Sequence, residues 1–385
     1  MEIAGALLLG GCPQNGGTDG GSELDQPGVA GPTGPAGPQG EQGPEGTQGE
    51  QGVPGEVGTG AILITDDPTP PDGYTFTGFS FNLSDSAWNT LPPLPAARAA
   101  GFSAAVGGKV YYAGGIDPNS VVQPNVYAFD PNANNWTTRA PLDTAVALGV
   151  GAGVGSKMYV IGGQDPNGDP TDLVQIYGPA SNSWSPGAPM PTPRAGMGGA
   201  VVAGKIYVFG GIDPNSDPLD VVERYDPATN GWSTLSPLPT PQAVNTGTAV
   251  GNRIYSMGGI TDPNAGLTDQ VYEFDVTAGT WSIQVALPEA LVLFGAEAVA
   301  GRIYVFGGVT SPSSPFVFKG ATWVFDPAQG TWSGLPATEP RGFMNSAVLN
   351  GQVYSLGGVT GDPAEILATA ERLVPPTVYY LHQKE

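Results

Sequence analysis

Two acidic loops carry the residues whose types and spacing come closest to a metal site. Each loop reads Asp-x-Asn-x-Asp-x-x-Asp and follows a pair of glycines. Oxygen ligands that alternate along the chain suit Ca²⁺, as in the first half of an EF-hand loop, although the distal Glu is absent. Asp, Pro, Asn and Gly are also the residues of simple turns held by Asx hydrogen bonds. The sequence leaves both interpretations open for Asp165, Asn167, Asp169 and Asp172, and for Asp213, Asn215, Asp217 and Asp220.

Three arginines could bind an anionic ligand. Arg98, Arg194 and Arg341 each lie sixteen residues before a Gly-Gly pair, and Gln242 takes the same place in another copy of the pattern. Guanidinium groups bind carboxylates through charge-assisted hydrogen bonds, so these positions are candidates for recognising an acidic ligand. The alternative is that each Arg bonds to a carbonyl of a neighbouring repeat or to a loop Asp.

The composition excludes several other kinds of site. The 385 residues carry a net charge of −22 with only 13 Lys and Arg, so the clustered cations that nucleic acid requires are missing. One Cys and one His cannot build a metal site from several such residues. Residues 199–205 have the Gly and Lys spacing of a P-loop, but Ile206 replaces the Ser or Thr, on a predicted hairpin. We find no catalytic motif, and no cofactor is expected apart from Ca²⁺.

The N-terminal residues predict an anchor and a linker. Residues 1–12 end in Leu-Gly-Gly-Cys, which resembles the lipobox of bacterial lipoproteins and implies acylation of Cys12. Glu2 stands where a basic segment belongs, and a start further upstream would supply that segment. A free Cys near the terminus is the alternative. Residues 13–27 are rich in Gly, Asn, Gln and Asp and predict a flexible linker.

Residues 28–60 predict a collagen-like stalk. Gly occupies every third position from Gly28 to Gly58, and only Gly fits the axis of a triple helix. A triple helix would make the protein a homotrimer with a rod of roughly 90 Å at ~3 Å per residue. Each chain contributes four Glu and no Lys to this segment, so three chains would repel one another. A single polyproline-II stalk is the alternative.

Residues 98–385 contain six copies of one pattern. Each copy predicts a small apolar strand, a two-residue turn, a buried strand that ends in Gly-Gly, a third strand and a fourth strand. Tyr lies three residues before every Gly-Gly pair, several third strands end in an aromatic residue followed by Asp-Pro, and most fourth strands carry Trp. The first glycines of the pairs are Gly114, Gly162, Gly210, Gly258, Gly307 and Gly357.

This pattern resembles the kelch repeat, through the glycine pair, the Tyr before it, the aromatic-Asp-Pro sequence and the Trp. The resemblance implies an all-β, six-bladed propeller whose blades are four-stranded antiparallel sheets. Glycine pairs would let backbones approach closely, and the Trp side chains would fill space between blades.

The closure of the propeller is expected to involve both ends of the chain. The last copy lacks the aromatic-Asp-Pro sequence, so residues 61–97 are expected to supply strands that complete it. Residues 79–91 predict the third and fourth strands of a blade, and residues 379–381 are expected to pair beside them. Seven blades, one of them degenerate, is the alternative.

In such a propeller Arg98, Arg194, Gln242 and Arg341 would surround one mouth of the central channel. We expect an exported protein at the cell envelope or cell surface, in contact with the membrane only through its lipid anchor. It would bind a protein or a glycan and would not be an enzyme. The alternative is a carbohydrate-active kelch enzyme of epimerase or oxidase type, which would need carboxylates and Tyr in the channel. A site like that of galactose oxidase also needs several His and a Cys-linked Tyr, which this chain cannot provide.

Overall fold

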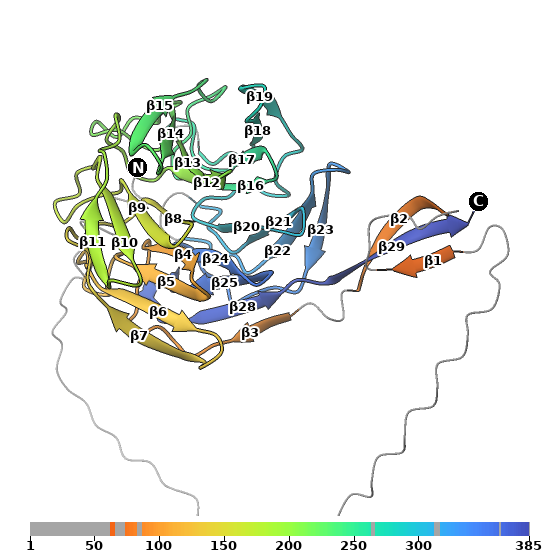
Figure 1. Cartoon of the computed structure of the whole chain (residues 1–385), viewed down its shortest axis with the longest axis horizontal. Coiled ribbons are helices and arrows are strands. Elements are labelled where there is room, and N and C mark those ends of the chain that lie inside the picture. The colour runs from red at the N-terminus through yellow and green to blue at the C-terminus, as the bar shows by residue number, and fades with distance from the viewer. Residues whose placement is uncertain are drawn as a thin grey trace, which may run out of the picture. The chain divides into compact units, whose positions relative to one another are not determined.

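The structure is a computed structural model that describes residues 62–65, 74–82, 87–262, 266–311, 316–361 and 363–384. In these ranges the chain forms six four-stranded antiparallel sheets, a three-stranded sheet and a short hairpin. The predicted all-β propeller with six blades is therefore confirmed (Figure 1). None of the described residues belongs to a helix long and apolar enough to cross a membrane.

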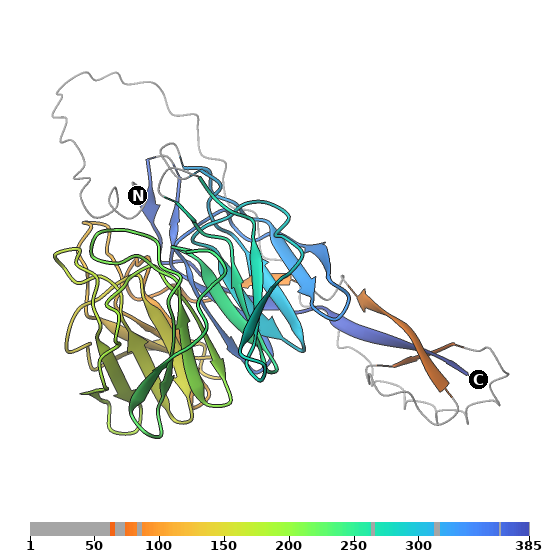
Figure 2. The ribbon, with the colours of Figure 1, turned by 90° about the horizontal axis from the view of Figure 1, so that it is seen from above.

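Five blades are built from consecutive strands, with the first strand of each innermost (Figure 1). Blade 1 consists of β4 (Phe102–Val106), β5 (Lys109–Ala113), β6 (Val126–Asp130) and β7 (Asn135–Arg139). Blade 2 consists of β8 (Val150–Val154), β9 (Lys157–Ile161), β10 (Val174–Gly178) and β11 (Ser183–Pro186). Blade 3 consists of β12 (Gly198–Val202), β13 (Lys205–Phe209), β14 (Val222–Asp226) and β15 (Gly231–Thr234). Blade 4 consists of β16 (Thr246–Val250), β17 (Arg253–Met257), β18 (Val271–Asp275) and β19 (Thr280–Ile283). Blade 5 consists of β20 (Gly295–Val299), β21 (Arg302–Phe306), β22 (Thr322–Asp326) and β23 (Thr331–Leu335). The strands of these blades run roughly alongside one another (Figure 2).

Blade 6 combines both ends of the propeller. Its inner strands are β24 (Asn345–Leu349), β25 (Gln352–Leu356) and β28 (Ala370–Val374), and its outer strand is β3 (Ala87–Thr90). Strand β3 pairs antiparallel with β28, with Trp88 opposite Leu373. The prediction that an N-terminal segment completes the last blade is therefore confirmed. A hairpin of β26 (Val359–Thr360) and β27 (Glu365–Ile366) lies between β25 and β28 in the sequence.

The prediction that residues 79–82 and 379–381 join the last blade was wrong. These residues belong to a separate three-stranded sheet, in which β29 (Thr377–Lys384) pairs with β1 (Ile62–Thr65) on one side and β2 (Tyr74–Asn82) on the other. Two prolines, at 375 and 376, follow β28 and lack the N–H groups that a continuing ladder requires, so the chain leaves the blade there. The lipobox at Cys12, the linker 13–27 and the collagen-like segment 28–60 lie outside the described residues.

The glycines of the repeat serve turns and close backbone contacts. Gly107 and Gly108 have φ of 57° and 74°, as the predicted two-residue turn between the first two strands requires. The first glycine of a pair packs against the next blade, because a Cβ at Gly114 would lie 2.5 Å from the carbonyl oxygen of Val146. The predicted role of the glycine pairs in close backbone approach is confirmed.

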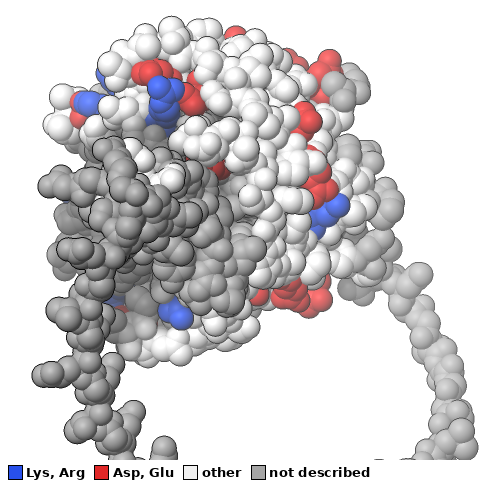
Figure 3. Space-filling model, turned by 90° about the vertical axis from the view of Figure 1, so that its right-hand side faces the viewer, with Lys and Arg blue, Asp and Glu red and all other residues white. Residues whose placement is uncertain are grey.

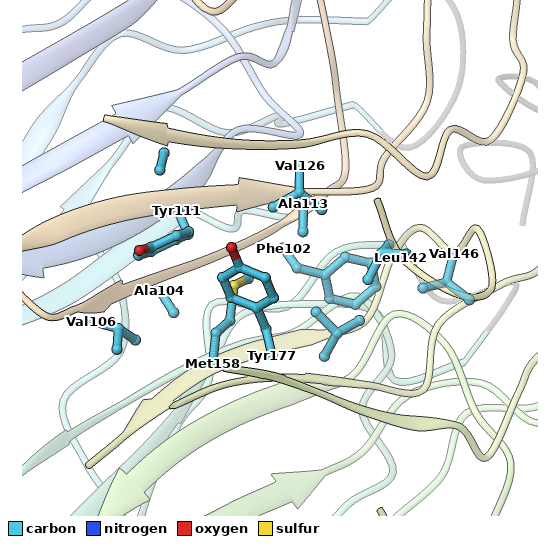
Figure 4. Packing of buried hydrophobic residues seen from close by; sticks show 12 residues of the cluster. Phe102, Ala104, Val106, Tyr111, Ala113, Val126, Leu142, Val146, Met158 and Tyr177 are labelled. Carbon is cyan, nitrogen blue, oxygen red and sulfur yellow. The ribbon is translucent and has the colours of Figure 1, made fainter. Parts of the chain in front are cut away.

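The hydrophobic core lies between neighbouring blades. Between blades 1 and 2, Phe102 and Leu142 pack beside Tyr111 and Tyr177 (Figure 4). The outer Trp residues also join blades: Trp184 in blade 2 donates from Nε1 to the carbonyl oxygen of Ala140, at 2.9 Å. The predicted position of the Trp side chains between blades is confirmed, and the inner strands are left to surround the axis.

Candidate functional site

The arginines expected at the channel mouth are buried inside the blades. Arg194 is 0% exposed, and its Nη2 lies 2.5 Å from Oε2 of Glu223. Its Nη1 donates to the carbonyl oxygen of Val221 at 2.8 Å. Burial lowers the pKa of Arg194 to about 10, while the negative charge of Glu223 opposes this shift, so the side chain stays charged at neutral pH.

The equivalent residues have partners of the same kind. Arg341 pairs with Glu371 at 2.7 Å and donates to Ser355 at 2.8 Å. Arg98 donates to Oδ1 of Asn125 at 2.8 Å. Gln242 accepts from the Ser256 hydroxyl at 2.6 Å. Internal groups therefore bind all four candidate side chains, which leaves them poorly placed for a ligand.

The backbone of the same position joins one blade to the next. The N–H of Arg194 donates to Thr171 in blade 2, and its carbonyl oxygen accepts from Gly163 in that blade. Its side chain bonds within blade 3. Arg341 joins blades 5 and 6 in the same way, through Lys319 and Gly308. The repeat position marks an interblade connection made by the backbone, while the Arg194 and Arg341 side chains bond to a Glu of the following blade and not to a loop Asp.

The two acidic loops have the geometry of Asx turns. Oδ1 of Asp165 accepts from the backbone N–H groups of Asn167 and Asp169, at 2.8 and 3.0 Å. Asp213 accepts in the same way, and these hydrogen bonds, chiefly the one from Asp217, lower its pKa. Among the described residues no group of three or more His, Cys, Asp or Glu could hold a metal ion. The hydrogen bonds of Asp165 and Asp213 are those of the turn interpretation, and calcium binding by these loops, with Asp172 and Asp220, stays a prediction.

The innermost strands enclose a central channel with two cavities, of about 190 and 320 Å³. Side chains there are small because neighbouring inner strands nearly touch: a Cβ at Gly151 would lie 2.6 Å from the Ser103 carbonyl oxygen. The two cavities share seven of their lining residues, which come from all six blades. The cavities are therefore consecutive sections of one channel. These residues are Ser103, Val150, Gly151, Gly199, Gly247, Glu297 and Ser346.

A ring of left-handed residues surrounds the smaller cavity. The residue two positions before the start of each inner strand has a φ between 53° and 60°. These residues include β-branched Val244 and the bulky Leu148. Residues with large or branched side chains rarely adopt left-handed φ values, so other interactions must offset the cost of this backbone conformation. Backbone hydrogen bonds provide it: Leu148 donates to Ala100, Gly196 to Leu148, and Val244 to Gly196, at 2.6–2.8 Å. The six members are Ala100, Leu148, Gly196, Val244, Leu293 and Phe343.

Glu297 is the charged side chain of the channel wall. It is the third residue of β20, opposite Tyr304, and the other blades have Ala or Thr at this place. Burial raises its pKa to about 7, and a hydrogen bond with Ser346 opposes part of the shift. The carboxyl group therefore changes its charge near neutral pH, whereas an exposed Glu would not.

The sequence contained a signal for this residue that was missed. The equivalent residues are Ala104, Ala152, Ala200, Thr248 and Ala347, so a Glu breaks an otherwise small-residue column. Only the strand register shows that this column borders the channel. On the outer surface, Asp and Glu lie in several separate groups, some of them beside Lys or Arg (Figure 3).

The comparisons with known proteins agree with the architecture. The profile of the Attractin/LZTR1 β-propeller family matches residues 73–265 and, in an overlapping second match, residues 190–371. The chain belongs to the Attractin/LZTR1 β-propeller family. Its fold, a kelch-type propeller, is one that often binds proteins or glycans. No curated protein sequence matches the chain.

This member of the Attractin/LZTR1 β-propeller family also resembles a solved structure, that of YjhT. The TM-score is 0.65 with 20% sequence identity, over 73% of this chain and 96% of that chain. At this identity the likeness concerns the fold alone.

Proposed function

We propose that the propeller is a binding protein for a protein or glycan ligand, and that the central channel holds a small polar part of that ligand. The observation that carries the proposal is Glu297, a half-buried residue that lines the channel among described residues that are otherwise neutral. Ser103, Asn245, Thr246 and Ser346 add hydroxyl and amide groups to the same cavity. A few convergent polar groups in a concave site are typical of ligand recognition.

A glycan suits this channel better than a folded protein surface. The cavities lie at or below the lower end of the roughly 300–1,000 Å³ range of small-molecule sites, so each has room for a small group such as one sugar residue. Hydroxyl-rich ligands can exchange hydrogen bonds with Ser, Thr and Asn. The N-terminal sequence supports display of the propeller at the cell surface, on a stalk and through a lipid anchor at Cys12.

A carbohydrate-active enzyme of epimerase type is the second candidate. A carboxyl group with a pKa of about 7 can act as general acid or base near neutral pH, which favours Glu297 for such a role. Glycoside hydrolysis usually uses two carboxylates, and among the described residues that line the cavities Glu297 alone has one. The tyrosines before the glycine pairs, such as Tyr255 and Tyr304, are buried between blades and line neither cavity.

Glycan-array and pull-down screening of the full chain tests the binding function. We expect a glycan that binds the wild-type chain and loses affinity when Glu297 is replaced by Gln. A glycan or protein that binds Glu297→Gln as well as the wild type would contradict the channel as the site. For the enzyme, exchange of sugar hydrogens with deuterated water should require Glu297, and its absence would reject proton transfer.

Membrane fractionation of the full chain, expressed with a basic segment before Met1, tests the anchor. We expect Cys12→Ser to move the protein from the membrane to the soluble fraction. Identical fractionation of the two proteins would contradict acylation at Cys12.

A further inference from the structure

Among the described residues, the channel wall carries one ionisable side chain and no basic one. Of the residues that line the two cavities, Glu297 is the one whose side chain is ionisable, and no Lys, Arg or His is among them. A carboxylate removed from bulk water is costly unless a cation or several donors accompany it. Its hydrogen bond with Ser346 supplies one neutral donor. When Glu297 is ionised, the wall therefore repels an anionic ligand and favours a cationic one.

The side-chain donors of the smaller cavity are already used inside the protein. The Ser103 hydroxyl donates to the carbonyl oxygen of Ser346 at 2.5 Å. The Thr246 hydroxyl donates to the carbonyl oxygen of Phe294 at 3.1 Å. Nδ2 of Asn245 donates to Ser256 at 2.9 Å. These groups can still accept hydrogen bonds through their remaining lone pairs, so a ligand has to bring its own donors.

Asn345 leaves an acceptor without a donor. Its Nδ2 donates to the carbonyl oxygen of Gly101 at 2.7 Å, and this bond fixes the orientation of the amide. Its Oδ1 is buried and has no hydrogen-bond partner. A buried acceptor without a donor costs free energy, and a ligand N–H group would recover it where binding turns Oδ1 toward the cavity that Asn345 lines. Asn345 precedes Ser346, the partner of Glu297, and lines the smaller cavity together with both residues.

We propose that the channel binds a primary ammonium group carried by a small polyol, an unacetylated amino sugar being the simplest example. An ammonium group brings three donors and a positive charge, which match the Glu297 carboxylate and Oδ1 of Asn345. The sugar hydroxyls match the acceptor lone pairs of Ser103 and Thr246. This inference rests on the proposed function of the channel and names the chemical class of its ligand. It replaces the acidic ligand that the buried arginines had suggested.

Calorimetric titration of the full chain near neutral pH, with four probes, tests the inference. The probes are glucosamine, N-acetylglucosamine, glucose and glucuronate, which share a pyranose ring and differ in donors and charge. We expect glucosamine to bind roughly tenfold or more tightly than the other three, since a charge-assisted hydrogen bond is worth about one decade of affinity or more. Glu297→Gln should abolish that preference. Glu289→Gln is the matched control, because Glu289 pairs with Lys319 and lines neither cavity.

A second variant keeps the test valid if Glu297→Gln folds poorly. Glu297→Ala restores the residue found in four other blades, so it should fold and should also lose the preference for glucosamine. Equal binding of glucose and glucosamine would overturn the ammonium inference and leave glycan recognition standing. Tightest binding of glucuronate would overturn it as well.

A peptide arm separates the two sources of an ammonium group. If a Lys-containing peptide binds through Glu297 while none of the sugars does, the sugar ligand is overturned and the channel recognises protein. If neither sugars nor peptide bind, both the inference and the proposed channel function are overturned.

Discussion

The backbone N–H of Ala100 donates to the carbonyl oxygen of Phe343 at 2.9 Å, across the junction of blades 1 and 6. Phe343 donates in turn to Leu293, and the chain of bonds from Ala100 through Leu148 and Gly196 to Val244 continues around the channel. The left-handed ring thus ties inner strands that are distant in sequence.

The ring position of Gly196 should tolerate a methyl group better than an inner-strand glycine does. A Cβ at Gly196 would have its nearest neighbours at 3.6 Å, so Gly196→Ala should cost only the left-handed strain, about 1 kcal/mol. A Cβ at Gly247 would lie 2.3 Å from Phe209 and 2.8 Å from the Gly199 carbonyl oxygen, so Gly247→Ala should cost about 2–3 kcal/mol. Denaturant unfolding of both variants measures the difference. A greater loss for Gly196→Ala would contradict this account of the inner wall.

Arg194→Ala should destabilise the propeller strongly, because Glu223 would remain buried without its partner. We expect a loss of about 3–5 kcal/mol in the free energy of unfolding. The double variant Arg194→Met with Glu223→Met should recover much of that loss, since it removes both charges. Arg224→Ala is the control, because Arg224 bonds only weakly to Ser233 at 3.4 Å on the exposed side. Similar stabilities of Arg194→Ala and Arg224→Ala would refute a structural role for the buried pair.

Glu297 should make the stability of the folded chain depend on pH near neutrality. Because the folded-state pKa is raised to about 7, the folded protein keeps a proton that the unfolded chain releases, and stability falls as pH rises through this window. Glu297→Gln cannot titrate, so its stability relative to wild type should increase from about pH 5 to about pH 8, by on the order of 2 kcal/mol. The neighbouring Tyr304 does not titrate in this range, since burial raises its pKa to about 12. Thermal unfolding across this window gives the difference, and a value independent of pH would show that the carboxyl group has an ordinary pKa.

Trp88 should contribute to closure of the propeller although it lies outside the six repeats. Its Nε1 donates to Thr322 at 3.0 Å, and its ring meets Phe306 edge-on at 5.0 Å. Trp88→Ala should therefore cost about 2–4 kcal/mol, somewhat less than a fully buried Trp. Asn89→Ala serves as control, because Asn89 is exposed and its amide bonds only to Ala87 nearby. Equal melting temperatures of the two variants would mean that β3 does not hold blade 6 closed.

The collagen-like segment should set the oligomeric state if it forms a triple helix. Gly43 occupies the repeating position that only Gly can fill, so Gly43→Ala should disrupt the helix and shift the full chain from trimer to monomer. Gln42→Ala, which keeps every Gly, should leave the trimer intact. Sedimentation of the three proteins decides the matter, and a wild-type monomer would indicate a single extended stalk.

The sequence determined the repeat, and with it the blade. Strand pairs, two-residue turns and glycine pairs are local features, so the spacing of Tyr and Gly-Gly was enough to predict four-stranded blades. The prediction of strands in residues 79–91 also gave an outer strand from the N-terminal side, which β3 supplies. Local signals failed at β29, because pairing with β1 and β2 depends on contacts between the two ends of the chain.

The tertiary structure decided which side chains reach the channel. Arg194 and Glu297 both stand at repeat positions close to the axis, but one lies buried against Glu223 and the other lines two cavities. Arg194 lies in the connection before β12, where its backbone bonds to blade 2 and its side chain to blade 3, whereas Glu297 lies within the innermost strand β20. Residue spacing therefore identified one equivalent position in the repeats, but it did not show that the polar residues there are buried. The contacts between blades determined that the arginines are bonded inside the blades and that, among the described residues lining the channel, Glu297 supplies the carboxyl group.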